Sequence, residues 1–123
     1  MKLEALCKNF SVCKTSHEEI PAEGFCFFAR TDGEISLVCE SEFVPDCAYA
    51  REDGWRAFRV SGELDFSLVG ILASITSALA QKEIPVFAVS TYNTDYILVR
   101  SEYFTSAADT LSENGYNVEI CTK

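Results

Sequence analysis

The sequence predicts an α+β fold whose second half follows the ferredoxin-like order β-α-β-β-α-β. Two observations predict it. Residues 66–82 and 102–114 repeat their apolar side chains with the period of an α-helix. Runs rich in β-branched and aromatic residues surround both helices, at residues 55–61, 86–92, 95–100 and 116–120. In this fold a four-stranded antiparallel sheet carries both helices on one face.

The first 54 residues are rich in predicted strands but lack the first helix of that plan. The predicted strands are residues 6–14, 25–30, 34–40 and 48–51. The turn Thr31-Asp32-Gly33 joins the second of these to the third, and Asp53-Gly54 predicts a turn into the strand at residue 55. Residues 41–44 are expected to form one helical turn. We therefore expect a degenerate copy of the plan in residues 1–54 and a complete copy in residues 55–123.

The first helix is expected between residues 66 and 82. Its apolar stripe consists of Leu68, Ile71, Leu72, Ile75 and Leu79. Asp65 or Ser67 can cap its start, because both side chains accept hydrogen bonds from free backbone N–H groups. The polar run Gln81-Lys82-Glu83, followed by Pro85, ends it.

The second helix is expected between residues 102 and 114. Ser101 is its expected N-cap, and Gly115 directly follows its C-terminus. Its apolar stripe consists of Phe104, Ala107, Ala108 and Leu111. Asn93-Thr94 form the short turn between the two strands that precede it.

The charge balance excludes two classes of partner. The 123 residues include 10 Lys and Arg against 19 Asp and Glu, a net charge of −9. So acidic a chain repels phosphate backbones and anionic membrane surfaces, so we expect neither nucleic acid nor membrane as a partner. No apolar run is long enough to span a bilayer, and the N-terminus has no apolar signal segment. These features predict a cytoplasmic protein.

Six cysteines stand at positions 7, 13, 26, 39, 47 and 121. No two of them have the CxxC spacing of zinc or redox motifs, and the chain carries a single histidine. Cys26 and Cys39 lie inside apolar runs, where a free thiol behaves as a small hydrophobic side chain. The pattern favours buried structural thiols, with metal or redox chemistry as the alternative.

The sequence shows no recognisable catalytic set. A nucleophilic Ser or Cys would need His17, which lies in the polar stretch of residues 15–24, an expected loop that does not hold a general base rigidly. Phosphate-binding glycine loops, the nucleophile elbow and the HExxH motif are absent from the sequence. We therefore expect no enzyme activity, no cofactor and no metal.

Two segments could bind a small molecule. Residues 62–71 run from a strand into the first helix, whose free N–H groups and positive dipole end can hold a carboxylate. Gly70, expected in the first turn, indicates a close approach to the backbone, either by a ligand or by the packed sheet. Residues 90–96 are rich in hydroxyls and include Asp95, which could bind an ammonium group or form an ordinary turn. Together the two segments would complement a zwitterion.

Three stretches of the second half resemble a known family. Trp55-Arg56-Ala57, residues 64–74 and residues 84–99 are similar to ACT domains of the CASTOR-related type, tandem ACT-like proteins that bind amino acids. The run from Ser90 to Val99 is the most specific part. The resemblance covers residues 55–121 well and extends loosely to the first half. It makes residues 55–123 a complete ACT domain and residues 1–54 a degenerate ACT-like subdomain.

The resemblance also implies a ligand site between two ACT units. By motif position, the implied ligand-binding residues are Gly70, Ile71, Pro85, Val86, Thr91, Tyr92 and Asp95. In the sensors of this family, an acidic residue three places after the glycine helps to hold a basic side chain. Ala73 stands at that place here. The resemblance thus implies amino-acid binding, and not arginine in particular.

A chain with one complete ACT unit would need a second copy to form such a site. The resemblance therefore implies a homodimer that joins two copies of residues 84–95 and holds two symmetric ligand sites. The function expected is a non-enzymatic regulatory or sensor module that binds an amino acid and signals to an unknown protein partner. The alternatives are a structural or protein-interaction domain with no small-molecule ligand, and an enzyme of unrecognised type.

Overall fold

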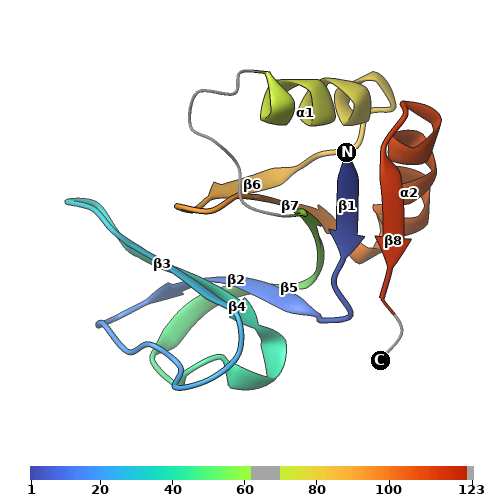
Figure 1. The fold of residues 1–123 in the computed structure, drawn as a ribbon. Helices are drawn as coiled ribbons and strands as arrows, with labels where there is room; N and C mark the ends of the chain where they lie inside the picture. The colour runs from blue at the N-terminus through green and yellow to red at the C-terminus, as the bar shows by residue number, and fades with distance from the viewer. Residues whose placement is uncertain (62–69, 122–123) are drawn as a thin grey trace. The chain divides into compact units, whose positions relative to one another are not determined.

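The computed structural model describes residues 1–61 and 70–121, which form eight strands, two α-helices and two single-turn 3-10 helices (Figure 1). The strands are β1 (Lys2–Ala5), β2 (Phe10–Thr15), β3 (Cys26–Arg30), β4 (Ile35–Glu40), β5 (Ala48–Val60), β6 (Phe87–Ser90), β7 (Asp95–Arg100) and β8 (Asn117–Ile120). The helices are α1 (Ile71–Gln81) and α2 (Phe104–Glu113), and the 3-10 helices are η1 (Ser41–Phe43) and η2 (Ser101–Tyr103).

The chain divides into two units. Unit 1 consists of Met1–Cys7 and Arg56–Lys123, and unit 2 of Lys8–Trp55. The predicted division into residues 1–54 and 55–123 differs from this one at the N-terminus, because β1 pairs with β5 and β8 and so belongs to unit 1. That unit 2 is a degenerate ACT-like subdomain stays a prediction.

Unit 1 confirms the α+β class and the order β-α-β-β-α-β from β5 to β8. The predicted four-stranded antiparallel sheet is wrong in two respects. β1 lies between β5 and β8, which adds a strand, and it runs parallel to β8, which makes the sheet mixed. β1 joins the sheet because Leu3 and Ala5 are fully buried and alternate along the chain as a short strand requires.

One apolar core lies between the sheet of unit 1 and its two helices. Each of the three strands β1, β5 and β7 contributes two alternate residues to it, so the helices cover one face of the sheet. The fully buried strand residues of this core are Leu3, Ala5, Phe58, Val60, Ile97 and Val99. The helices contribute Ile75, Ala78, Leu79, Ala107 and Leu111.

Helix α1 begins later than expected, at Ile71, and Gly70 is its N-cap residue rather than a member of its first turn. The expected caps Asp65 and Ser67, and the stripe residue Leu68, lie outside the described residues. At the other end, Lys82 is the C-cap, as the polar run predicts.

Helix α2 follows η2, so Ser101 does not cap it with its side chain as expected. Its C-terminus matches the prediction. Gly115 adopts a φ of 93°, the Tyr116 N–H donates to the Leu111 carbonyl, and the Gly115 N–H donates to the Ser112 carbonyl. This pattern is a Schellman motif, which satisfies the last carbonyl groups of the helix.

Strand β5 continues through the predicted turn at Asp53-Gly54. Phe10 pairs with Trp55 and Val12 pairs with Glu52. Four residues of β5 (52–55) therefore lie opposite three residues of β2 (10–12). The extra residue is a β-bulge, and Gly54 takes a φ of 85° there. Asp53-Gly54 therefore form an irregularity within β5 and not the predicted turn into a new strand.

Unit 2 is an antiparallel arrangement of β3, β4, β2 and the first part of β5. The predicted hairpin is confirmed, and the Thr31 N–H donates to the Glu34 carbonyl across its turn at 2.9 Å. Its small core contains Cys13, Leu37 and Cys39, with Cys26 packed against it. Burial raises the pKa of the Cys39 thiol to about 12 and also raises the pKa values of Cys13 and Cys26. These three are structural thiols, as expected.

Two cysteines depart from that expectation. Cys7 and Cys121 form a disulfide with their Cα atoms 5.8 Å apart. They follow the parallel pair Ala5 and Ile120 at the ends of β1 and β8. Since β1 was not expected, no pattern in the sequence predicted that these two residues lie together.

Within the part of the chain that the structure describes, no helix is both long and apolar enough to cross a membrane.

Candidate functional site

The start of helix α1 is the first half of the candidate site. Gly70 adopts a φ of 85°, and its carbonyl accepts the first intrahelical hydrogen bond, from the Ser74 N–H at 2.8 Å. A Cβ atom built on Gly70 would meet no described atom within 4 Å. Its left-handed backbone conformation therefore explains the glycine, and no described part of the sheet approaches it closely.

The electrostatics of this helix start suit an anion. Among the described residues no side chain caps α1, and its first turn contains no acidic residue. The eleven residues of α1 carry no charged side chain at all. The free N–H groups of the first turn and the positive end of the helix dipole are thus not offset by the helix itself.

The turn between β6 and β7 is the second half. Ser90 and Asp95 pair across it, and the Ser90 hydroxyl donates to Asp95 Oδ1 at 2.6 Å. The Thr91 hydroxyl donates to the Thr94 carbonyl at 3.0 Å, and the Thr91 N–H donates to the same carbonyl at 2.8 Å. Much of the polar chemistry of this run therefore stabilises the turn itself.

Thr94 holds the turn to the sheet. Its side chain is buried, and its hydroxyl donates to the Val60 carbonyl at 2.8 Å. Val60 ends β5, so this bond fixes the turn against a central strand of unit 1. Thr94 is absent from the predicted site residues, because only the strand order reveals what its hydroxyl contacts.

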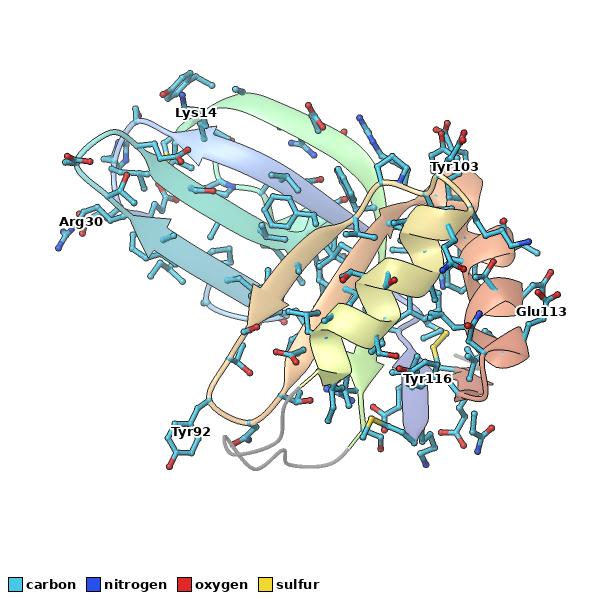
Figure 2. All side chains as sticks on the ribbon, turned by 90° about the horizontal axis from the view of Figure 1, so that it is seen from above. Lys14, Arg30, Tyr92, Tyr103, Glu113 and Tyr116 are labelled. Carbon is cyan, nitrogen blue, oxygen red and sulfur yellow. A yellow bond between two sulfur atoms is a disulfide. The ribbon has the colours of Figure 1, made fainter. Side chains whose placement is uncertain are left out.

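Five of the seven predicted residues lie toward one end of unit 1. Both views show the N-terminal end of α1, with Gly70 and Ile71, directed toward the same end as the β6–β7 turn (Figures 1 and 2). Thr91 and Tyr92 are exposed there, and Tyr92 projects away from the turn with 78% of its surface accessible (Figure 2). The half-buried Asp95 completes this group.

The other two predicted residues are not brought to that end. Pro85 and Val86 precede β6, whereas Thr91 follows it. At the rise of a β-strand, roughly 16 Å of chain separates Val86 from Thr91. Within one chain, the seven residues therefore do not form a single compact site.

Comparisons with known proteins place this geometry in context. A model of the ACT domain matches residues 50–113. The human protein called "Cytosolic arginine sensor for mTORC1 subunit 1" is 33% identical over 94 residues. The match covers 71% of this chain and 29% of that protein, so the chain spans less than a third of this relative.

Two solved structures have similar folds. The crystal structure of protein Atu0741 from Agobacterium tumefaciens matches with a TM-score of 0.87 and 32% identity, over 99% of this chain and 94% of that chain. The regulatory subunit of aspartate kinase from Thermus thermophilus, in its ligand-free form, matches with a TM-score of 0.64. Its identity is 7%, with 92% of this chain and 96% of that chain covered, so this likeness concerns the fold alone.

Proposed function

Because the chain belongs to the ACT domain family, we propose that it is a regulatory module that binds an amino acid without catalysing a reaction. The observation that carries the proposal is the start of α1 at Gly70, where no described side chain caps the helix and no described atom lies within 4 Å of a built Cβ, on a chain related to an arginine sensor. The N–H groups of the first turn would hold the α-carboxylate of the ligand.

The β6–β7 turn would hold the α-ammonium group. Asp95 offers a carboxylate whose Oδ1 is oriented by the Ser90 hydroxyl. A negatively charged acceptor at the same end as the helix start complements the two charges of a free amino acid. We assign Gly70, Ile71, Thr91, Tyr92 and Asp95 to one wall of this site.

A second copy of the chain would supply the rest. Pro85 and Val86 lie at the far end of β6, so a ligand that touches all seven residues would need these two from another subunit. A two-fold homodimer that joins the 84–95 segments would meet this need and create two equal sites. A protein partner would then recognise the ligand-bound dimer. We propose the cytoplasm as the compartment of the protein.

Ala73 bears on which side chain the bound amino acid carries. It is exposed and stands in the first turn of α1, at the place where the sensors of this family have an acidic residue. Among the described residues, the first turn of α1 therefore offers no carboxylate to a basic side chain. The proposal therefore names an amino acid and does not name arginine.

A screen of the purified chain against the twenty amino acids tests the proposal, with thermal unfolding and size-exclusion chromatography as readouts. A ligand present at 100 times its Kd adds about 2.7 kcal/mol, which raises the Tm by several degrees. If no amino acid changes either readout, the chain is the alternative, a protein-interaction domain with no small-molecule ligand.

The site itself is tested by Asp95→Asn, which removes the charge but keeps a side chain that can pair with Ser90. We expect it to weaken the binding of the identified amino acid at least tenfold, measured by titration calorimetry. Asp109→Asn is the matched control, because Asp109 is an exposed acidic residue on α2. Equal affinities for the two variants would show that the ligand binds elsewhere.

A further inference from the structure

Three side chains of unit 2 gather potential metal ligands at one point. A nitrogen of His17, a carboxylate oxygen of Glu19 and the sulfur of Cys47 all lie within 4.8 Å of one another. His17 and Glu19 are exposed, and Cys47 is half-buried. The set combines three different donor types from two segments of the chain.

Strand pairing brings these segments together. Thr15, the last residue of β2, pairs with Ala48, the first residue of β5. The Ser16 N–H donates to the Cys47 carbonyl at 3.0 Å and continues that ladder by one residue. Cys47 therefore stands directly beside the residues that lead into the loop.

The loop carries His17 and Glu19 in a tight turn. The His17 carbonyl accepts hydrogen bonds from the Thr15 hydroxyl at 3.0 Å and from the Glu19 N–H at 3.1 Å. The Cys47 thiol also points at this carbonyl, with its sulfur 3.7 Å from the oxygen. Hydrogen bonds thus hold the backbone at all three ligand-bearing residues.

One donor pair of the cluster has the spacing that a small tetrahedral cation needs, and the sulfur of Cys47 lies within 4.8 Å of both atoms. His17 Nε2 lies 3.6 Å from Glu19 Oε1. Ligands at zinc bond lengths of 2.0–2.3 Å in a tetrahedron lie about 3.3–3.8 Å apart. The His17 Nδ1 atom lies 3.1 Å from the Ser16 hydroxyl, the contact that in metal sites orients an imidazole whose Nε2 binds the ion.

We propose that His17, Glu19 and Cys47 bind a zinc-class divalent cation, with water as the fourth ligand. A thiolate together with an imidazole and a carboxylate favours Zn²⁺ or Co²⁺ over the hard cations Mg²⁺ and Ca²⁺. On binding, the Cys47 thiol releases its proton to solvent and the sulfur bonds to the metal, with no change of oxidation state. The bound ion would link the loop after β2 to the start of β5.

Spectroscopy with Co²⁺ is the first test, on the tag-free full chain in oxygen-free buffer without added thiols. We expect one Co²⁺ per chain, with a sulfur-to-cobalt charge-transfer band that Zn²⁺ abolishes by displacement. Cys47→Ser should remove the band, and Glu19→Gln should weaken Zn²⁺ binding at least tenfold by calorimetry.

Glu18→Gln is the matched control, because Glu18 neighbours the cluster but forms an ion pair with Arg30. It should bind Zn²⁺ as the unaltered chain does. The absence of the charge-transfer band, equal binding of Mg²⁺, or full binding by Cys47→Ser would each overturn the proposal. In those cases the contact between His17 and Glu19 is a simple ion pair that forms when the imidazole is protonated.

Discussion

Glu83 is the residue, among those described, that adopts a left-handed backbone without being a glycine, with a φ of 59°. It follows the C-cap of α1, where the Glu83 N–H donates to the Ala80 carbonyl and the Ile84 N–H donates to the Leu79 carbonyl. Both helices therefore end in the same Schellman motif. In α2 the equivalent position is Gly115, which accepts this conformation without steric cost.

We expect Glu83→Gly to stabilise the protein. A left-handed conformation costs a residue with a Cβ about 1–2 kcal/mol, part of which glycine loses again as backbone entropy. The net gain should be about 0.5–1 kcal/mol, or a Tm about 2–4 °C higher in a calorimetric scan. Gly115→Glu makes the reverse change and should lower the Tm by a similar amount. A lower Tm for Glu83→Gly would mean that the glutamate side chain contributes contacts that outweigh the strain.

At the scale of elements, the pair Glu4 and Arg59 links β1 to β5. The two residues are cross-strand partners, and the Arg59 Nε donates to Glu4 Oε1 at 2.8 Å. This hydrogen bond, the charge of Arg59 and the Ser61 hydroxyl lower the pKa of the Glu4 carboxyl below its ordinary value of 4.5, against the opposing effect of burial.

The sign of the pH dependence follows from that direction. A lowered pKa in the folded state means that Glu4 stabilises the fold above its ordinary pKa and loses this contribution as the pH falls through the folded value. The Tm difference between the unaltered chain and Glu4→Gln should therefore be largest near pH 7 and should shrink below about pH 4. Glu119→Gln is the control, since Glu119 is exposed and pairs with Lys2 at 3.5 Å. A difference that stays constant down to pH 2.5 would contradict the prediction.

The elements also show where sequence patterns suffice and where they fail. Long periodic segments such as those of α1 and α2, and strands β6 to β8, are predicted because their own residues carry the pattern. β1 is missed because four residues contain too little periodicity, and its neighbours β5 and β8 are remote in the chain. The cluster of His17, Glu19 and Cys47 is missed for a related reason, since spacing along the chain does not reveal cross-strand neighbours.

For the whole molecule, the disulfide between Cys7 and Cys121 spans 114 residues of sequence. Closing so long a loop in the unfolded chain stabilises the folded state by about 5 kcal/mol in the chain-entropy account. We expect Cys7→Ser with Cys121→Ser to lower the Tm by about 15–20 °C in non-reducing buffer. Cys47→Ser, in metal-free buffer, removes a half-buried thiol outside this bond and is the control. An unchanged Tm in the double variant would show that the bond adds nothing to stability.

The redox state of this bond in cells also bears on the proposed compartment. Disulfides persist in oxidising compartments and are rare in the cytosol. Alkylation of free thiols at the moment of lysis would distinguish the two states.

The candidate ligand site depends on whole-molecule features as well, because the sequence predicts its residues but only a dimer would join all seven.

Strand β1 belongs to unit 1, so unit 2 interrupts unit 1 in the sequence. β1 and the last part of β5 pair as antiparallel neighbours, and the Leu6 N–H donates to the Ala57 carbonyl at 2.9 Å. The chain leaves unit 1 after Cys7 and returns to it at Arg56, at the open end of this pair. Unit 2 is therefore, in topological terms, an insertion that replaces the loop of a β-hairpin. A short turn between Cys7 and Arg56 would close the same hairpin, so the pairing of β1 with residues 58–60 of β5 needs no residue of unit 2.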